Sequence, residues 1–343
     1  MIRIGTRGSQ LALKQAVLVQ EALKLADGRI ETELVIIHTR GDRIQDRPLA
    51  EIGDKGIFAS ELEQALLEGQ IDLAVHSAKD LPIKLADGLF ISAVLKRADV
   101  RDVLVVLKGG RVPHLRGDAL EEYEIACLED GEEHGRRTLA EAPHSFRIGS
   151  GSRRRQMLAG QIWENIICTD IRGNVDTRLR KLQEGSYDGI LLAKAGLDRL
   201  GIGSKREDIF DFYPLSPELF LPAACQGIIA VEAIESSAAA AVCKNITDKE
   251  TEISYLVERE VLSQLSADCS EAVAAWCRRG KKEQNPEAMR AADGQSPEAA
   301  LAVDELLLDV MYAGNRAKLT CMANVEEGRQ MAKQAAKIVK ERH

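Results

Sequence analysis

The chain repeats part of itself, and this repeat constrains the fold more than any other feature of its 343 residues. The run R-I-G-S-G-S-R-R-R-Q-M-L-A at 147–159 echoes R-I-G-T-R-G-S-Q-L-A-L at 3–13. A second run, L-Q-E-G-S-Y-D-G-I-L-L-A-K at 182–194, echoes L-L-E-G-Q-I-D-L-A-V-H-S-A-K at 66–79. Because two echoes occur in the same order, the sequence predicts two similar lobes in one chain.

Each lobe is predicted to be α/β. Hydrophobic periodicity in the first lobe predicts alternating elements: strand 2–5, helix 11–26, strand 33–39, helix 58–68 and strand 71–75. This alternation is typical of a parallel sheet with helices on its faces. We therefore predict a first lobe at 1–100 and 223–242, a second lobe at 101–222 with a surface insert at 107–146, and a C-terminal domain at 243–343 with helices at 253–265 and 325–342.

A cluster of polar side chains directly follows the apolar run at 71–75. They are His76, Ser77, Lys79 and Asp80, closed off by Pro82. In open α/β sheets, ligands bind beyond the carboxyl ends of the strands, so a binding site is expected here. On this stretch alone, an ordinary solvated loop that ends at a proline is the alternative.

Arginine is concentrated in the second lobe. Arg153, Arg154 and Arg155 stand at a predicted helix start, and Arg172 and Arg178 follow in I-R-G-N-V-D-T-R-L. Cations at a helix N-terminus oppose the helix dipole, and such local conflicts are expected at functional sites. Guanidinium groups bind carboxylate or phosphate through two hydrogen bonds, so the cleft between the lobes is expected to take a polyanion. A solvated basic face is the alternative.

Composition narrows the possible partners and the compartment. The 46 basic and 54 acidic residues give a formal charge of −8, which argues against nucleic-acid binding through bulk charge. No stretch reaches the ~18 apolar residues of a membrane span, and the first residues lack a signal-peptide core. The seven cysteines contain no C-x-x-C pair, so neither a disulfide framework nor a metal site is predicted. We expect a cytoplasmic monomer without nucleic-acid or membrane partners.

Eight motifs occur in one order along the chain: T-R-G-S-x-L-A-L, T-R-G-D, G-x-K-G-x-F, H-S-x-K-D-x-P, R-R-Q, R-G-N-V-x-T-R-L, Y-D-x-I-L-A-x-A-G-L-x-R-L-G (with one extra Leu here) and L-P-A-x-x-Q-G. With these motifs the chain resembles the hydroxymethylbilane synthase family, also called porphobilinogen deaminases. The resemblance covers 1–106 and 147–275 well, and the insert and the residues after 275 only loosely.

The resemblance implies two lobes like those of type II periplasmic binding proteins and a small α+β domain that carries a cysteine. By position this is Cys269, eleven residues after Glu258, and it is expected to hold a dipyrromethane cofactor through a thioether. The implied enzyme joins four porphobilinogen molecules head to tail onto the cofactor, releasing ammonia each time. Hydrolysis then frees the linear tetrapyrrole hydroxymethylbilane. No metal is implied.

The implied substrate also gives roles to individual residues. Each pyrrole carries an acetate and a propionate, so the growing chain is a polyanion. Its carboxylates are expected to meet Arg7, Ser9, Lys55, Ser77, Lys79, Ser150, Ser152, Arg154, Arg155, Arg172 and Arg178. Loss of ammonia from porphobilinogen leaves a cationic azafulvene, and Asp80, the matching family residue, is the predicted catalytic carboxylate that stabilises this charge. His76 is predicted to be a structural partner at the strand end.

Several positions depart from the family pattern: Gly151 replaces a serine, Cys225 a glycine, Ala267 and Asp268 two glycines, and Ala272 a proline. A carboxylate beside the thiol of Cys269 disfavours the reactive thiolate. A two-lobed binding or regulatory protein without catalysis is the alternative function, because a fold alone does not carry an activity. Asp80, the arginines and Cys269 together favour an enzyme, since a binding protein has no use for a thiol tether.

Overall fold

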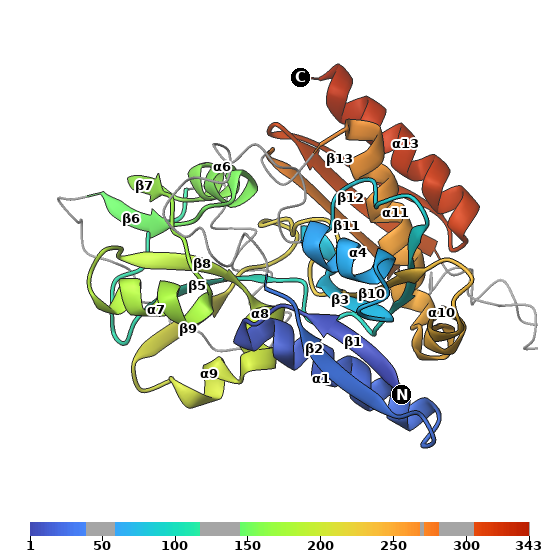
Figure 1. Ribbon diagram of the computed structural model, residues 1–343. Helices are drawn as coiled ribbons and strands as arrows, with labels where there is room; N and C mark the ends of the chain where they lie inside the picture. The colour runs from blue at the N-terminus through green and yellow to red at the C-terminus, as the bar shows by residue number, and fades with distance from the viewer. Residues whose placement is uncertain (39–58, 117–144, 268–270, 281–304, 343) are drawn as a thin grey trace, which may run out of the picture.

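The computed structural model describes residues 1–38, 59–116, 145–267, 271–280 and 305–342. Within these ranges the chain forms two five-stranded sheets and one three-stranded sheet. Figure 1 shows the two larger α/β units next to each other, with the C-terminal unit, in orange and red, beside the first.

The first sheet has the strand order β2-β1-β3-β10-β4. Its strands are β1 (Ile2–Thr6), β2 (Thr32–Ile36), β3 (Leu73–Ser77), β4 (Leu89–Val94) and β10 (Ile229–Ile234). Strand β1 runs parallel to β2 and β3, whereas β10 runs antiparallel to both of its neighbours. The helices of this lobe are α1 (Gln10–Ala26), α4 (Ser60–Leu67) and α10 (Ala238–Cys243). The first lobe is therefore a parallel sheet completed by one strand that comes from far along the chain.

The second sheet has the equivalent order, β7-β6-β8-β5-β9. Its strands are β5 (Asp102–Leu107), β6 (Phe146–Gly149), β7 (Ile166–Thr169), β8 (Gly189–Ala193) and β9 (Phe210–Pro214). Its helices are α6 (Arg153–Ile162), α7 (Val175–Gln183), α8 (Lys194–Leu200) and α9 (Ile202–Lys205). Again β6 is parallel to both neighbours and the fourth strand, β5, is antiparallel to its own.

The strand in fourth place of each sheet, β10 in the first lobe and β5 in the second, comes from a segment that crosses over from the other lobe. The chain leaves the first lobe after β4 to make β5 of the second sheet, and returns after β9 to make β10 of the first. The expected pair of type II binding-protein-like lobes is thereby confirmed. Two crossing segments, rather than one, join the lobes.

The internal repeat is visible in matching ion pairs. In the first lobe the backbone N–H, Nε and Nη2 of Arg3 donate to Asp72, at 2.8, 3.1 and 2.7 Å. In the second lobe the same three groups of Arg147 donate to Asp188, at 2.8, 3.2 and 3.1 Å. Each pair ties the first parallel strand of its lobe to the turn before the third.

The C-terminal unit is an antiparallel sheet with helices on one face. It contains β11 (Val273–Gly280), β12 (Glu305–Tyr312), β13 (Asn315–Met322), α11 (Lys249–Leu265) and α13 (Val325–Glu341). The predicted C-terminal helices are confirmed, although α11 begins four residues early because Asp248 caps it by accepting from Thr251 N. The buried carboxylate of Glu258 fastens this unit to the first lobe through Arg97, with N···O distances of 2.6 and 3.1 Å.

Residues just beyond position 242 pack against the core of the first lobe. Cys243 is buried in the core of the first sheet, and Ile246 packs against the same core. This packing favours a first lobe that extends to Ile246, beyond the predicted boundary at 242. The predicted insert at 107–146 lies mostly outside the described residues, although Leu107 ends β5 and Phe146 begins β6.

Candidate active site

The predicted site residues follow the carboxyl ends of parallel strands in both lobes. Arg7 and Ser9 follow β1, Ser150 and Ser152 follow β6, and Arg172 follows β7. Lys79 and Asp80 form a short 3-10 helix with Ala78 directly after β3. The sheets thus gather residues from four separate parts of the sequence at the edges where α/β sheets bind ligands.

The strand before Asp80 reaches further than the sequence predicts. Instead of ending at Val75, β3 continues to Ser77 because β10 pairs with it there, Ile229 opposite Ser77. His76 is therefore a strand residue, buried, with its Nε2 3.0 Å from Oε2 of Glu232. Asp80, three residues past the strand end, is exposed.

Ser77 is held from the side of the first helix. Its Oγ accepts from Nε2 of the buried Gln15 on α1, at 2.9 Å. The hydroxyl thus takes part in packing helix α1 against the end of β3. A role for Ser77 in ligand binding remains a prediction.

Lys79 lies where the two lobes meet. Its Nζ is 3.4 Å from Oε1 of Gln226. Burial lowers the pKa of Lys79 to about 8, while the neighbouring Asp80 opposes this fall and the second lobe's Arg155 adds to it. The ammonium group is therefore within electrostatic reach of both lobes.

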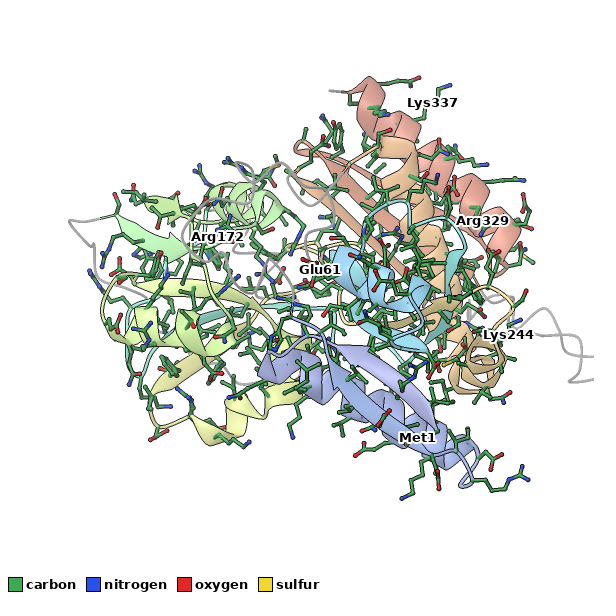
Figure 2. All side chains as sticks on the ribbon, viewed as in Figure 1. Met1, Glu61, Arg172, Lys244, Arg329 and Lys337 are labelled. Carbon is green, nitrogen blue, oxygen red and sulfur yellow. The ribbon has the colours of Figure 1, made fainter. Side chains whose placement is uncertain are left out.

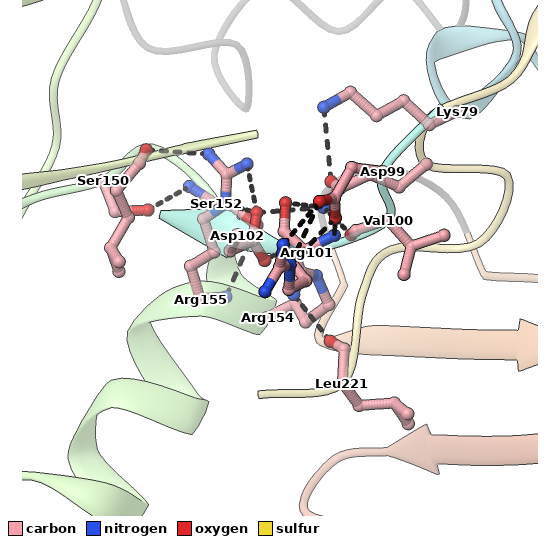
Figure 3. Close-up of polar contacts among 12 residues, drawn as sticks. Lys79, Asp99, Val100, Arg101, Asp102, Ser150, Ser152, Arg154, Arg155 and Leu221 are labelled. Carbon is pink, nitrogen blue, oxygen red and sulfur yellow. Dashed lines mark hydrogen bonds and ion pairs between the residues drawn. The ribbon is translucent and has the colours of Figure 1, made fainter. Parts of the chain in front are cut away.

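Arg154 and Arg155 are buried and turned toward one carboxylate. Nε and Nη2 of Arg155 donate to Oδ1 of Asp102, at 3.0 and 2.7 Å, and Nη2 of Arg154 forms an ion pair with Oδ2, at 2.8 Å (Figure 3). Their main-chain acceptors are Leu221 O for Arg154 and Leu191 O for Arg155. Burial alone would raise the pKa of Asp102, but the two arginines outweigh it and lower the pKa to about 2.

The sequence predicts that Arg154 and Arg155 bind ligand carboxylates, and the structure shows that they also bind a carboxylate of the protein. In the structure both guanidinium groups face Asp102, with only 2% of Arg154 and 7% of Arg155 exposed. Two cations nevertheless share one carboxylate, so a positive charge is left over. Among the described residues, Nε of Arg154 also has no hydrogen-bond partner. Binding of a ligand carboxylate by this pair remains a prediction.

Arg178 is fixed at the start of α7. Asn174 caps this helix by accepting from Thr177 N, and Nε of Arg178 donates to Gly173 O at 2.8 Å. Gly173 has a φ of 108°, and a Cβ there would lie 2.5 Å from Thr177, so only glycine fits. The loop sequence R-G-N-V-x-T-R thus builds the position of Arg178.

The electrostatics of Arg178 connect it to the other lobe. Burial, aided by Arg155, lowers the pKa of Arg178 to about 10, and Asp80 opposes this fall. Arg172 acts on it from the same loop, and Figure 2 shows Arg172 on the second lobe. We define the charge cluster as the charged residues of both lobes that these pairwise interactions connect: Lys79, Asp80, Asp102, Arg154, Arg155, Arg172 and Arg178.

The remaining described serines have structural partners. Ser9 caps α1 by accepting from Ala12 N at 3.3 Å. Ser152 caps α6 by accepting from Arg155 N, and Ser150 accepts from Ser152 N at 3.3 Å. Their oxygens are used as acceptors, which leaves the hydroxyl protons to donate.

Sequence reasoning missed two members of the site region, Asp102 and Gln226. Asp102 opens the apolar strand β5, and nothing in its local sequence indicates a partner about fifty residues away. Gln226 lies within L-P-A-x-x-Q-G, so the motif was visible, but its contacts were not. It is fully buried, and its Nε2 donates to Val100 O and to Oδ1 of Asp102, at 2.7 and 3.0 Å.

Two predicted site residues, Lys55 and Cys269, lie outside the described residues. In the part of the chain that is described, no group of three or more His, Cys, Asp or Glu side chains could hold a metal ion. No described helix is long and apolar enough to cross a membrane.

Comparison with known proteins identifies the family. Residues 2–241 match the family model described as "Porphobilinogen deaminase, dipyromethane cofactor binding domain". The porphobilinogen deaminase of Streptococcus sanguinis (strain SK36) is 38% identical over 298 residues, which are 86% of this chain and 88% of the relative. The chain belongs to the porphobilinogen deaminase family.

Other porphobilinogen deaminases are similarly related. The protein named so in Roseiflexus sp. (strain RS-1) is 39% identical over 79% of this chain and 80% of its own length. Among solved structures, the periplasmic VFT2 domain of Bordetella pertussis BvgS is 12% identical and covers 71% of this chain and 86% of its own, with a TM-score of 0.39. Such a distant match carries no weight beside the strand order described above.

Proposed function

We propose that the chain acts as a hydroxymethylbilane synthase through Asp80 of the first lobe and the cations that surround it. The porphobilinogen deaminase family to which it belongs consists of transferases of tetrapyrrole biosynthesis. One observation carries the assignment of roles: the exposed carboxylate of Asp80 lies next to Lys79 and within electrostatic reach of Arg178 from the opposite lobe. A non-catalytic binding role is not favoured.

The charge cluster suits a ligand rich in carboxylates. It contains five cations and two carboxylates, and the buried Asp102 offsets only part of the charge of Arg154 and Arg155. A buried net positive charge costs free energy unless an anion offsets it, so this surplus favours an anionic ligand between the lobes. Arg172, Arg178 and Lys79 are among the described residues that would hold the acetate and propionate groups of a dipyrromethane. When bound, that cofactor would supply the free pyrrole carbon to which the first unit is joined, and each later unit would be joined to the terminal pyrrole of the growing chain.

Asp80 has the chemistry that the reaction requires from the protein. When ammonia leaves porphobilinogen, the C–N bond electrons depart with nitrogen and the substrate gains a positive charge. A carboxylate held beside this charge lowers the barrier, because it interacts more strongly with the transition state than with the substrate. After the new carbon–carbon bond forms, the same carboxylate can accept the proton lost from the pyrrole carbon.

The cofactor assignment is tested by the intact mass of the purified protein. A mass above that of the sequence by a two-pyrrole adduct is expected, and Cys269→Ser should lose this adduct together with activity. Cys321→Ser is the matched control, since Cys321 is a half-buried free cysteine on β13. An active enzyme with unmodified mass would overturn the tether at Cys269.

We also propose porphobilinogen as the substrate, and a cytoplasmic monomer as the working form. These follow from the family, the small-molecule reaction and the sequence composition. Sedimentation of the purified enzyme tests the monomer, since a dimer at micromolar concentration would contradict it.

A further inference from the structure

The two segments that cross between the lobes lie side by side. Ala98 N, on the outgoing segment, donates to Gly227 O on the returning one, at 3.1 Å. Gly227 has a φ of 89°, and a Cβ there would lie 2.5 Å from Ala98 O, so the segments approach too closely for any side chain at that position. Leu95 N donates to Ile229 O in the same way, at 3.1 Å. The connection between the lobes is thus a paired, closely packed structure.

Gln226 stands at the centre of this paired connection. Its side-chain Nε2 donates to Val100 O and to Asp102 Oδ1 on the outgoing segment, at 2.7 and 3.0 Å. Its Oε1 faces the ammonium group of Lys79, at 3.4 Å, and its backbone oxygen accepts from Arg97 Nε, at 2.8 Å. One fully buried side chain therefore contacts the charged residues of both lobes.

The orientation of this amide is determined by its surroundings. If the amide were reversed, its oxygen would face Val100 O and the Asp102 carboxylate, and its NH₂ group would face an ammonium group. Both contacts would be repulsive, and unpaired buried polar groups cost about 1–3 kcal/mol each. The donor end therefore points to the second lobe and the acceptor end to Lys79. At 3.4 Å, the contact with Lys79 acts mainly through charge and dipole.

We propose that Gln226 is a positioning residue for the reaction: its amide holds Lys79 beside Asp80 and sets this end of the first lobe against the Asp102–Arg155 pair of the second. The inference rests on the proposed function, because it acts through the loop that carries Asp80. The amide can accept from Lys79 and donate to Asp102 at the same time. Methionine at this position keeps the size but loses both contacts, and glutamate keeps only the acceptor.

The first part of the test measures turnover of the cofactor-loaded enzyme. For Q226M we expect kcat to fall about 10- to 100-fold, the effect of a small misplacement of catalytic groups, with a much smaller change in KM. The matched control is Q20M, which removes a glutamine hydrogen bond to Thr32 Oγ1 in the first lobe, away from the charge cluster. Q20M should keep kcat within about twofold. In a K79M background the additional loss caused by Q226M should largely disappear, because the effect passes through Lys79.

The second part measures Lys79 itself and needs no turnover. Lys79 is titrated by competitive acetylation with acetic anhydride at a series of pH values, followed by peptide mass spectrometry of the loaded enzyme. Four charged groups act on Lys79 and stay constant in both variants: Asp80, Asp102, Arg154 and Arg155. Losing the acceptor in Q226M should lower the pH midpoint of labelling, whereas a carboxylate in Q226E should raise it.

Opposite shifts in the two variants would support the positioning role, because a merely structural defect would not move the midpoint in opposite directions. Unchanged midpoints in both variants, or losses of kcat that multiply in the K79M background, would overturn it. Should Q226M fail to fold, Q226E, which keeps the side-chain length, tests the same contact through its own midpoint. The midpoints could shift as expected while the Asp80→Asn enzyme turns over at the wild-type rate. In that case the catalytic role proposed for Asp80 would be wrong, but the contact between Gln226 and Lys79 would stand.

Discussion

The two lobes share one frame and differ at the ends of their third strands. In both lobes an arginine on the first strand binds an aspartate before the third, and both sheets have the same order of equivalent strands. The sheet register makes Leu73 equivalent to Gly189, since each pairs with the isoleucine of the first strand. Lys79 and Asp80 then correspond to Ala195 and Gly196. The duplicated frame gives the fold, and unequal strand ends carry the chemistry.

The register also corrects the sequence echo in one detail. The A-K pairs at 78–79 and 193–194 match by sequence, but in the sheets Lys194 takes the place of Ala78 rather than that of Lys79. Lys194 instead forms an ion pair with Asp198 on its own helix, at 2.9 Å. The second lobe therefore has no equivalent of Lys79.

The strands in fourth place of the two sheets, β5 and β10, also differ, and here the charged residue is in the second lobe. Asp102 of β5 pairs with Ala193, and the equivalent position of β10 is Ile229, which pairs with Ser77. The second lobe thus buries a carboxylate where the first has an apolar side chain. This carboxylate is the partner of Arg154 and Arg155, so it allows the arginines to be buried in that lobe alone.

The largest effect on stability is expected for Asp102→Asn. The change leaves two buried guanidinium groups without their anion, which should lower the free energy of unfolding by about 3–5 kcal/mol. The pKa of Asp102 is lowered from 3.8 to about 2 in the fold, so its stabilisation is present above about pH 4 and is lost as the pH falls toward 2. Denaturant titrations between pH 2 and 7 should show a smaller difference from wild type at the acid end.

The equivalent position supplies the control. Ile229→Val should cost only about 1 kcal/mol, with no dependence on pH, because it removes one buried methylene. If Asp102→Asn were no more harmful than Ile229→Val, the buried carboxylate would not be what distinguishes the second lobe.

Equivalent glycines should give an intermediate effect in both lobes. A Cβ at Gly5 would lie 2.2 Å from Cδ1 of the buried Ile71, and one at Gly149 would lie 2.9 Å from Tyr187. We expect Gly5→Ala to lower the free energy of unfolding by about 2–3 kcal/mol and Gly149→Ala by about 1–2 kcal/mol, because the half-buried Tyr187 can move aside.

Urea titration of the two glycine variants checks this order. Gly160→Ala is the control, since Gly160 lies in helix α6 with open space around it and alanine there should stabilise the protein by about 0.5–1 kcal/mol. Equal losses, or a larger loss for Gly149→Ala, would show that the side chains packed against β1 and β6 at these glycines do not lie as described.

The smallest effect should come from the shared ion pairs, and it should be the same in both lobes. The side chains of Asp72 and Asp188 are 30% and 33% exposed. Replacing either by asparagine should cost about 0.5–1 kcal/mol, and less at high salt, because exposed ion pairs are weak and screened. Thermal unfolding at low salt and at about 1 M salt measures the pair, and a loss several times larger in one lobe would contradict the equivalence.

Local patterns made much of this structure predictable. The repeat predicted two lobes, the hydrophobic periodicity predicted the first helix, and the motif R-G-N-V-x-T-R contained the capped loop that holds Arg178. The burial of Arg154 and Arg155 could not be predicted, because it depends on Asp102, which the strand exchange brings from a distant part of the chain. The contacts of Gln226 have the same cause: both crossing segments must be in place before they exist.

The central claim is that the first lobe supplies the catalytic carboxylate and the second most of the cations. The most direct test is the turnover of porphobilinogen by Asp80→Asn, compared with Asp198→Asn, an aspartate that follows the third strand of the other lobe. Asp80→Asn should keep its fold and its two-pyrrole adduct but lose about 10²- to 10⁴-fold in kcat, whereas Asp198→Asn should stay within about threefold of wild type. Wild-type turnover by Asp80→Asn, or an equal loss in both variants, would contradict the claim.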